Sequence, residues 1–297
     1  MDNNFKSGYV GIVGRPNVGK STLLNYMVGQ KIAIISDKPQ TTRNKILAIM
    51  SDDDAQVVFL DTPGFHKPKN KLGENMIKAV NETVDEVDLL LMVIEPNDEP
   101  RENELKIIEK LGNTPAILVI NKVDAVQKDL ILPVIAKYSS LHNFKEIIPI
   151  SAKTGYGIEE LKKVIKENLC DGPMYYPEEM VTDQQERQIV AEIIREKMLN
   201  LLDKEVPHGV AIEIIKMKSR EKDGGIIYDI SANIYCEKDS HKGIIIGAGG
   251  KTLKRIGTLA REECENMLES KVFLELWVKV KKDWRNSNNL MREIGLS

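Results

Sequence analysis

Glycine, lysine and serine occur near the N-terminus in a spacing that suits phosphate binding. The segment fits the pattern G-x-x-x-x-G-K-S, follows the apolar run Tyr9 to Val13, and opens a stretch with helical spacing. Glycines let the backbone approach phosphate oxygens, and the amides of a helix N-terminus favour negative charge. Lys20 can reach β and γ phosphates, and the Ser21 hydroxyl can bind Mg²⁺. The predicted phosphate loop comprises Gly14, Arg15, Pro16, Asn17, Val18, Gly19, Lys20 and Ser21.

A second polar segment follows the apolar run Val57 to Leu60. A carboxylate at such a strand end is placed to hold Mg²⁺ through water, and the amide of a glycine three residues later can approach the γ-phosphate. The sequence D-T-P-G alone is an ordinary turn, and it gains meaning from the phosphate loop upstream. The predicted γ-phosphate segment comprises Asp61, Thr62, Pro63, Gly64 and Phe65.

A polar stretch lies between the first predicted helix and the second predicted strand. A threonine hydroxyl here could complete the coordination of Mg²⁺ when a γ-phosphate is present, and the loop would then order with triphosphate and loosen after hydrolysis. Thr42 is preferred over Thr41, but the sequence leaves the choice open, and a solvated polar loop is the alternative. The predicted switch comprises Gln40, Thr41, Thr42, Arg43 and Asn44, and the predicted Mg²⁺ ligands are Ser21, Thr42 and Asp61.

Two further loops suit recognition of a guanine base. Asp124 follows the apolar strand Ala116 to Ile120. Its carboxylate can accept two hydrogen bonds from the N1–H and N2–H₂ edge of guanine, whereas adenine lacks both donors there, so an ATPase is disfavoured. Lys122 can lay its stem along the base, and the Ala152 amide can donate to the guanine carbonyl. The predicted guanine site comprises Asn121, Lys122, Asp124, Ser151, Ala152 and Lys153.

These loops require a sheet that brings the carboxyl ends of its strands together. Short apolar runs alternate with helical stretches, which predicts an α/β domain with a mostly parallel sheet, of the P-loop GTPase type. Strands are predicted over 9–13, 45–50, 57–60, 89–94, 116–120 and 146–150, and helices over 20–28, 73–87, 101–111, 130–141 and 158–169. Asp171-Gly172-Pro173 and Pro177 then interrupt the pattern, so the first domain is predicted over 1–172 and a linker over 173–182.

Residues 183–297 have a different element order. A helix over 183–202, strands over 210–218 and 226–236, a glycine-rich turn, a helix over 252–268 and a strand over 272–281 predict a smaller α+β domain of the type II KH kind. The turn matches the G-x-x-G loop that clamps RNA backbone, and basic residues surround it. The motif alone is weak, and its middle pair carries no charge, so phosphate contact is assigned to Lys251. The predicted RNA site comprises Gly247, Ala248, Gly249, Gly250, Lys251, Lys254 and Arg255.

The last predicted strand alternates apolar and polar residues between Leu274 and Lys281. That pattern indicates a half-buried strand. Trp277 is assigned to core or surface packing, although an indole can also stack on a base.

Composition limits the classes of protein. The chain has 297 residues, 42% hydrophobic and 29% charged, with a net charge of −3, so a uniformly basic nucleic-acid binder is excluded. Three isolated cysteines and four scattered histidines argue against a disulfide framework and a zinc site. No apolar run approaches the roughly 20 residues that span a bilayer, and the first residues form no signal-peptide core. A cytoplasmic protein is expected.

Taken together, the motifs resemble the Era family, which belongs to the translation-factor class of GTPases and carries a C-terminal KH domain. Besides the loops above, the resemblance rests on Gly29 to Ile32, Gln40 to Arg43, Ile193 to Lys197 and Leu274 to Lys281. It implies a Mg²⁺-dependent GTPase that assists small ribosomal subunit assembly and binds small-subunit ribosomal RNA near its 3′ end. It also implies a monomer that associates peripherally with the inner face of the cell membrane.

Two catalytic expectations accompany this resemblance. Ras-type GTPases orient the attacking water with a glutamine at the position that Phe65 occupies here, so slow intrinsic hydrolysis is expected, with water positioned by backbone groups, a partner or a cation. Asn17 resembles the asparagine that recruits K⁺ in related GTPases. Two other functions stay open: a GTPase acting on another RNA or a modification complex, and a constitutive RNA-binding module with a nucleotide that is not hydrolysed.

Overall fold

The computed structural model describes residues 5–38, 40–65, 67–97, 99–222 and 224–296, and its backbone divides into two compact units. Unit 1 comprises Met1–Ile35, Thr42–Pro68 and Gly73–Asp183, and unit 2 comprises Ser36–Thr41, Lys69–Leu72 and Gln184–Ser297. The predicted linker falls within unit 1. There the backbone amides of Tyr175 and Tyr176 donate to Gln56 Oε1 at 2.7 and 2.9 Å, and the Thr182 hydroxyl donates to the Leu47 carbonyl at 2.7 Å.

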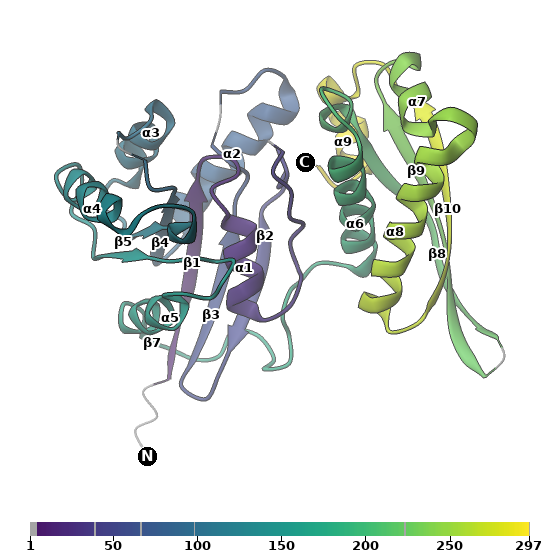
Figure 1. Cartoon of the computed structure of the whole chain (residues 1–297). Coiled ribbons are helices and arrows are strands. Elements are labelled where there is room, and N and C mark those ends of the chain that lie inside the picture. Colours follow the sequence, from purple (N-terminus) through teal and green to yellow (C-terminus); the bar gives the residue numbers. More distant parts are fainter. Residues whose placement is uncertain (1–4, 39, 66, 98, 223, 297) are drawn as a thin grey trace. The chain divides into compact units, whose positions relative to one another are not determined.

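Unit 1 is built on one twisted sheet (Figure 1), with strand order β2-β3-β1-β4-β5-β6 and a short β7 beside β1. Its strands are β1 (Lys6–Gly14), β2 (Ile46–Ser51), β3 (Ala55–Asp61), β4 (Leu89–Ile94), β5 (Ala116–Ile120), β6 (Glu146–Pro149) and β7 (Cys170–Asp171). β1, β3, β4, β5 and β6 are mutually parallel, whereas β2 runs antiparallel to β3. The sheet is therefore mostly parallel, as predicted.

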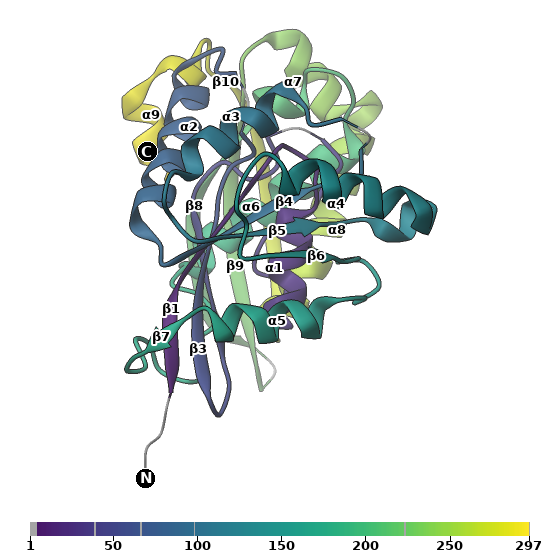
Figure 2. The same ribbon diagram turned by 90° about the vertical axis from the view of Figure 1, so that its left-hand side faces the viewer.

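Helices cover both faces of this sheet (Figure 2). α1 (Lys20–Val28) and α5 (Ile158–Glu167) pack on one face, and α2 (Lys71–Glu86), α3 (Glu102–Leu111) and α4 (Ile131–Ser139) pack on the other. Every residue of β4 and β5 is buried, which is why these strands are continuous apolar runs rather than alternating ones. The phosphate loop begins at the end of β1, and the γ-phosphate segment begins at the end of β3. The two guanine loops follow the ends of β5 and β6.

Unit 2 contains a three-stranded sheet of order β10-β9-β8. Its elements are α6 (Glu186–Leu201), β8 (Ala211–Lys222), β9 (Gly225–Cys236), α7 (Asp239–Ile246), α8 (Lys251–Leu268), β10 (Lys271–Val280) and α9 (Asn288–Glu293). β9 is antiparallel to β8 and parallel to β10. Alternate residues of the strands form one core with the apolar sides of α6, α7 and α8. The element order is that of the predicted KH domain, with two additional helices, α7 and α9, among the described residues.

The longer of these two unpredicted helices, α7, forms against its local sequence preference. Its sequence DSHKGIII ends in three β-branched isoleucines after a glycine, a composition that disfavours helix on local grounds. Ile245 is buried in the core of unit 2, so tertiary packing outweighs this local preference.

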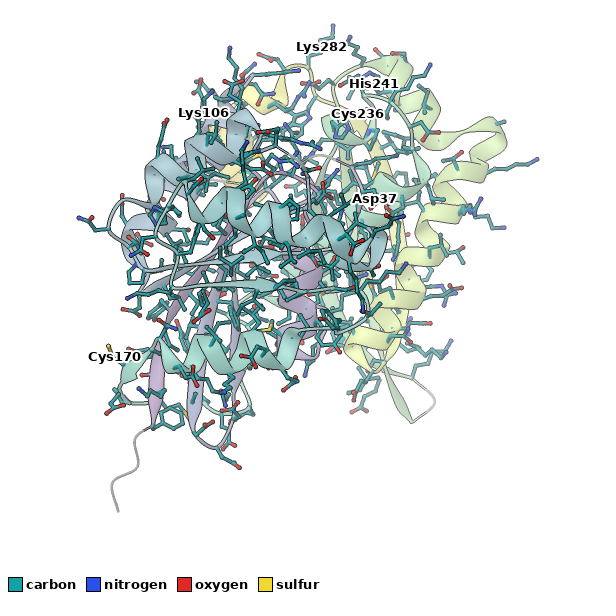
Figure 3. All side chains as sticks on the ribbon, turned by 60° about the vertical axis from the view of Figure 1, so that its left-hand side comes forward. Asp37, Lys106, Cys170, Cys236, His241 and Lys282 are labelled. Carbon is teal, nitrogen blue, oxygen red and sulfur yellow. The ribbon has the colours of Figure 1, made fainter. Side chains whose placement is uncertain are left out.

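Two global expectations concern thiols and membranes. Cys170 is exposed in unit 1, whereas Cys236 and Cys264 are buried in unit 2, and all three are free thiols (Figure 3). Within the described part of the chain, none of the helices has the length and hydropathy needed to cross a membrane.

Candidate nucleotide and RNA sites

The phosphate loop connects β1 to α1 in a conformation that glycine permits. Gly19 has a φ of 97° and precedes the first helical residue. A Cβ atom at Gly19 would lie 2.2 Å from Asn121 Nδ2, so any side chain would clash with the guanine loop. Asn17, also left-handed with a φ of 65°, has a short polar side chain that tolerates this region. The loop therefore passes close to the guanine loop.

Lys20 is folded inward beneath the phosphate loop. Its ammonium donates to the carbonyls of Gly14 at 3.2 Å and Arg15 at 3.0 Å, and the side chain is buried. Burial lowers the pKa of Lys20 to about 8, while the charge of Asp61 opposes that shift. A buried cation under a ring of backbone amides is the electrostatic arrangement that a polyphosphate would complete.

The three predicted Mg²⁺ ligands lie together. The Ser21 hydroxyl donates to Asp61 Oδ2 at 2.8 Å and lies 2.9 Å from the Thr42 hydroxyl. Thr41 instead directs its hydroxyl to the Lys38 carbonyl at 2.6 Å, so the geometry separates the two threonines that the sequence left open. Two hydroxyls and a carboxylate are the hard oxygen donors that Mg²⁺ prefers.

The Asp61 carboxylate lacks some of the hydrogen bonds that a buried charge needs. Its side chain is buried, and Oδ1 has no hydrogen-bond partner among the described residues. Burial raises the pKa of Asp61 to about 6, although Lys20 and the Ser21 hydroxyl favour the ionised form. A buried carboxylate with an unsatisfied oxygen suits a cation, and the donor set therefore fits Mg²⁺.

This carboxylate predicts a pH-dependent stability difference. With nucleotide and Mg²⁺ removed, Asp61→Asn should be more stable than the wild-type chain at pH 7 by up to about 3 kcal/mol, because ionising the buried carboxylate costs free energy. The folded pKa is raised above 3.8, so the stabilising contribution of the protonated carboxyl to the wild-type chain is present below about pH 4 and is lost as pH rises through about 6, and the advantage of the variant grows over the same range. Urea unfolding in chelator at pH 7 and pH 4.5 measures the gap. An equal gap at both pH values, or a less stable variant at pH 7, would contradict the assignment.

The segment after Asp61 is held against β1. The Thr62 hydroxyl donates to the Ile12 carbonyl at 2.8 Å, and the Phe65 amide donates to the Gly14 carbonyl at 3.0 Å. A Cβ atom at Gly64 would lie 2.7 Å from the backbone of Pro16, which explains the glycine. The Phe65 ring is buried in the core beside α2 and α3, so only its backbone faces the phosphate loop.

The remaining switch residues differ in exposure. Arg43 is buried, and Asn44 is exposed. Gln40 has a φ of 61° and is half-buried.

Asn121 connects both guanine loops to the phosphate loop. Its Nδ2 donates to the Val18 carbonyl at 2.8 Å, and its Oδ1 accepts from the Ala152 amide at 2.9 Å. The side chain is buried, so these bonds are shielded from water. One amide thus fixes three loops that are far apart in the sequence.

The other guanine-site residues surround this junction. Lys122 donates to the Asn17 carbonyl at 2.7 Å and pairs with Glu95. The Ser151 side chain is buried, whereas Asp124 and Lys153 are exposed. The Asp124 carboxylate is therefore accessible to a ligand, whereas the Asn121 side chain is already hydrogen-bonded to the backbone of Val18 and Ala152.

A buried ion pair behind the phosphate loop was not predicted. Glu104 of α3 is fully buried, and it accepts from Arg15 Nε at 2.7 Å and from the Tyr138 hydroxyl at 2.9 Å. Burial and then the Glu104 charge raise the pKa of Tyr138. The sequence holds a signal for this site, because Glu104 lies on the apolar side of α3 with Ile107, Ile108 and Leu111 at helical spacing.

The predicted RNA loop lies at the start of α8 in unit 2. Gly247, Gly249 and Gly250 all have positive φ, at 72°, 60° and 78°. A Cβ atom at Gly247 would lie 2.2 Å from Thr252 Oγ1, whereas Gly249 and Gly250 face open space. The exposed members of the predicted site are Ala248, Gly249, Lys251, Lys254 and Arg255.

An open groove of about 400 Å³ adjoins this loop. Gly250, Leu253, Lys254, Gly257, Thr258, Arg261, Leu274 and Leu276 line it. Its floor is apolar, and its rim carries Lys254 and Arg261. Such a combination suits bases against the floor and phosphates at the rim.

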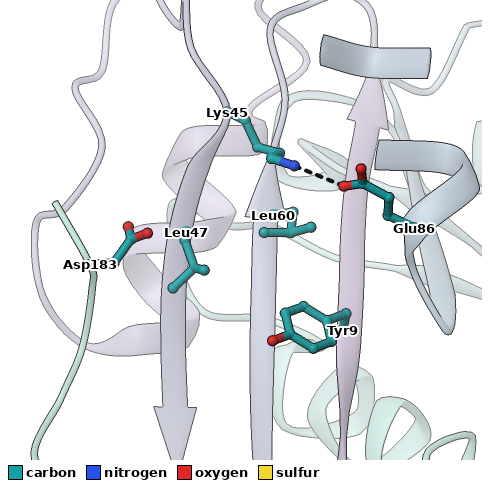
Figure 4. Close-up of a pocket in the computed structure, with 6 residues that line it drawn as sticks. All are labelled: Tyr9, Lys45, Leu47, Leu60, Glu86 and Asp183. Atoms are coloured by element: carbon teal, nitrogen blue, oxygen red, sulfur yellow. Dashed lines mark hydrogen bonds and ion pairs between the residues drawn. The ribbon is translucent and has the colours of Figure 1, made fainter. Parts of the chain in front are cut away.

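A second hollow, of about 330 Å³, lies on the α2 side of the unit 1 sheet (Figure 4). Tyr9, Lys45, Leu47, Leu60, Glu86 and Asp183 line it, and Lys45 Nζ lies 2.9 Å from Glu86 Oε2. It contains none of the residues predicted to bind nucleotide.

Known proteins share this organisation. A family model described as 50S ribosome-binding GTPase matches residues 9–122, and a KH domain model matches residues 205–285. The chain is 53% identical over 294 residues to GTPase Era of Ruminiclostridium cellulolyticum and 55% identical to that of Clostridioides difficile, with 98% of each chain covered. This chain belongs to the Era family of GTPases.

Solved Era structures agree with this assignment. The crystal structure of an Aquifex aeolicus Era variant bound to GDP and AlF₄⁻ has a TM-score of 0.95, with 40% identity, 99% of this chain and all of that chain covered. An Era complex with MgGDPNP and nucleotides 1506–1542 of 16S ribosomal RNA gives the same TM-score at 40% identity, with 99% of each chain covered. The expected fold, a P-loop GTPase domain followed by a smaller KH domain, is confirmed, as is the expected enzyme class. As an Era-family protein, the chain is a GTPase with an RNA-binding domain.

Proposed function

We propose that this Era-family GTPase binds small-subunit ribosomal RNA near its 3′ end and assists assembly of the small ribosomal subunit. The observation that supports the GTP-dependent part most is the meeting of Ser21, Thr42 and Asp61 beside Lys20. The RNA part is supported by the groove beside the G-x-x-G loop and by the 16S ribosomal RNA bound in the Era complex that this chain matches.

Different residues of the proposed site bind the phosphates, the guanine base and Mg²⁺. Lys20 and the backbone N–H groups of the phosphate loop, which Pro16 lacks, hold the β and γ phosphates, and the Asp124 carboxylate selects guanine. Ser21, Thr42 and Asp61 would hold Mg²⁺, which would supply positive charge against the phosphate oxygens. The Gly64 amide donates to the γ-phosphate. Because the Phe65 ring is buried in the core, no side chain at that position orients the attacking water, and slow intrinsic hydrolysis follows.

A cation at Asn17 is the second element of the proposed chemistry. K⁺ beside the phosphates would add positive charge where a glutamine or an arginine is otherwise used. Turnover in K⁺ should exceed turnover in Na⁺ severalfold at matched ionic strength, and Asn17→Asp should alter that ratio. Equal rates in the two salts would remove the potassium proposal and leave the Mg²⁺ assignment intact.

RNA capture should depend on the two open glycines of the G-x-x-G loop. Gly249→Asp with Gly250→Asp should lower affinity for single-stranded RNA about tenfold or more, because two carboxylates would face the phosphates that the loop approaches. Gly29→Asp with Gly112→Asp is a matched control. Both of those glycines also have positive φ, at 76° and 55°, and neither would place a Cβ atom within 3.4 Å of a neighbour.

Electrophoretic mobility shift of a labelled oligonucleotide measures the affinities of both pairs. Equal losses in the two pairs would show that added charge or strain, rather than the loop, causes the effect.

The identity of the RNA is tested by crosslinking in cells and sequencing. The proposal predicts enrichment of the 3′ region of the small-subunit ribosomal RNA, in the presence of a GTP analogue or of GDP. Enrichment of another RNA would favour a GTPase acting elsewhere. Absence of phosphate release with GTP, Mg²⁺, K⁺ and this RNA would contradict a hydrolytic cycle.

The family resemblance also supports a cytoplasmic, monomeric protein that contacts the inner face of the cell membrane peripherally. Sedimentation of the purified chain and fractionation of cells test these two points separately.

A further inference from the structure

The unit 2 sheet has a second face that the groove does not use. In β10, Leu274, Leu276 and Val278 pack toward the helices, so the alternate residues point to the opposite side. Strand register extends this outer face across β9 to β8, where Lys216 pairs with Ser231 and Lys218 with Asp229. We define the outer face by Glu213, Lys216, Lys218, Arg220, Lys222, Asp229, Ser231, Lys271, Phe273, Glu275, Trp277 and Lys279.

The outer face is basic on a chain that is acidic overall. Six of its residues are Lys or Arg, and three are Asp or Glu, whereas the whole chain has a net charge of −3. Lys216 and Arg220 share one carboxylate, since their nitrogens lie 3.7 and 3.0 Å from Asp229. Positive charge is therefore concentrated along β8 and at the ends of β10, which complements a polyanion.

Two large aromatic rings stand on this basic face. Phe273 is 54% exposed and Trp277 is 60% exposed, whereas Trp284 is 1% exposed. The sequence assigned Trp277 to core or surface packing, and the structure places it on the surface. The two residues are four positions apart on one strand, about 13 Å, so each ring would meet a different base. Exposed aromatics between lysines are the arrangement that stacks successive bases of a single strand.

The groove and the outer face share β10. Leu274 and Leu276 line the groove beside the G-x-x-G loop, and Phe273 and Trp277 lie on the reverse side of the same strand. The two surfaces are thus separate but adjoin along one strand. A strand of RNA leaving the groove could continue around this edge, since β10 is the edge strand of the sheet.

We propose that the outer face is a second binding surface for single-stranded RNA, with Phe273 and Trp277 as stacking platforms and the lysines as phosphate contacts. The ligand class follows from charge and from exposed rings together. The surface goes beyond the G-x-x-G groove of the proposed function, and the two are tested apart by disabling the groove.

The first experiment uses the full chain carrying Gly249→Asp and Gly250→Asp, and a 12-nucleotide oligouridylate as probe. Saturating probe should quench the fluorescence of exposed Trp277, and Trp277→Phe in the same chain should abolish the change while retaining affinity, because phenylalanine still stacks. Phe273→Ala with Trp277→Ala should lower affinity by about thirtyfold or more, since each ring stacks one base at about 1 kcal/mol or more. Ile226→Ala is the matched control, since Ile226 is 52% exposed on the same sheet at the opposite parity.

A second measurement isolates the phosphate contacts. Lys218→Gln with Lys279→Gln should reduce the slope of log affinity against log salt by about 1.4, or about 0.7 for each phosphate lost. Thermal melting of each variant verifies folding.

Three results would overturn the proposal. The first is Trp277 fluorescence that stays unchanged at saturating probe. The second is a double aromatic variant that binds as tightly as its background. The third is a dimer in sedimentation that Phe273→Ala with Trp277→Ala abolishes, which would make the face a contact between copies of the chain. If wild-type RNA binding fails while the outer-face signal persists, the groove rather than this surface is wrong.

Discussion

Replacing Asp124 with asparagine is expected to change the preferred nucleotide from GTP to xanthosine triphosphate. The aspartate accepts from two donors of guanine, N1–H and N2–H₂. Xanthine keeps N1–H but has a carbonyl in place of the amino group, and an asparagine amide offers one acceptor and one donor to match. A site built to pair with polar groups rejects an unmatched analogue by about 10⁴-fold, so the preference ratio should invert by that order.

Direct calorimetric titration of each chain with GTP and, separately, with xanthosine triphosphate measures this inversion. The exposed Asp129→Asn is the matched control, because it removes one carboxylate from the same connection without touching the guanine loop. If Asp124→Asn weakens both nucleotides equally, Asp124 stabilises the loop and does not read the base.

Replacing Lys20 with methionine should lower GTP affinity by about 10² to 10⁴-fold. The ammonium would make two charge-assisted contacts to phosphate, at about 1.5–3 kcal/mol each. Methionine has similar length and no charge. The nucleotide-free variant should unfold at no lower temperature than wild type at pH 7, because the buried ammonium, whose pKa is lowered to about 8, costs folding free energy there.

The effect of Lys20→Met on folding stability depends on pH. The folded pKa of Lys20 lies below its ordinary value of 10.5, so the stabilising contribution of the neutral amine is present above about pH 10 and is lost as pH falls through 8. Lys106→Met removes an exposed lysine paired with Glu102 and should leave affinity unchanged. Loss of affinity together with a large drop in melting temperature would mean that Lys20 supports the fold and not the phosphates.

Sequence patterns predicted the nucleotide half well because its loops follow buried strands. β4 and β5 are fully buried, and continuous apolar runs locate such strands and the loops after them. The sequence could not resolve which of two adjacent threonines points toward Ser21. The backbone conformation of the loop decides this, and the residue types do not encode it. The structure directs Thr42 there and Thr41 to the Lys38 carbonyl.

Contacts between distant residues account for what was missed. Glu104 pairs with Arg15 across 89 positions, and α7 is helical because Ile245 reaches a core formed by residues of α6, α8 and the three strands. Neither contact is local, so neither propensity nor motif spacing reports it. Trp277 likewise has the alternation of a half-buried strand, and only the register of the sheet shows that it lies on the exposed side.

We expect the phosphate loop and the guanine loops, which Asn121 connects, to hold one nucleotide jointly. Titration calorimetry with GDP, guanosine and pyrophosphate tests it most directly. The account predicts one GDP per chain, displaced by guanosine and by pyrophosphate, each binding far more weakly than GDP. Guanosine or pyrophosphate binding alongside GDP, without competition, would contradict a single shared site.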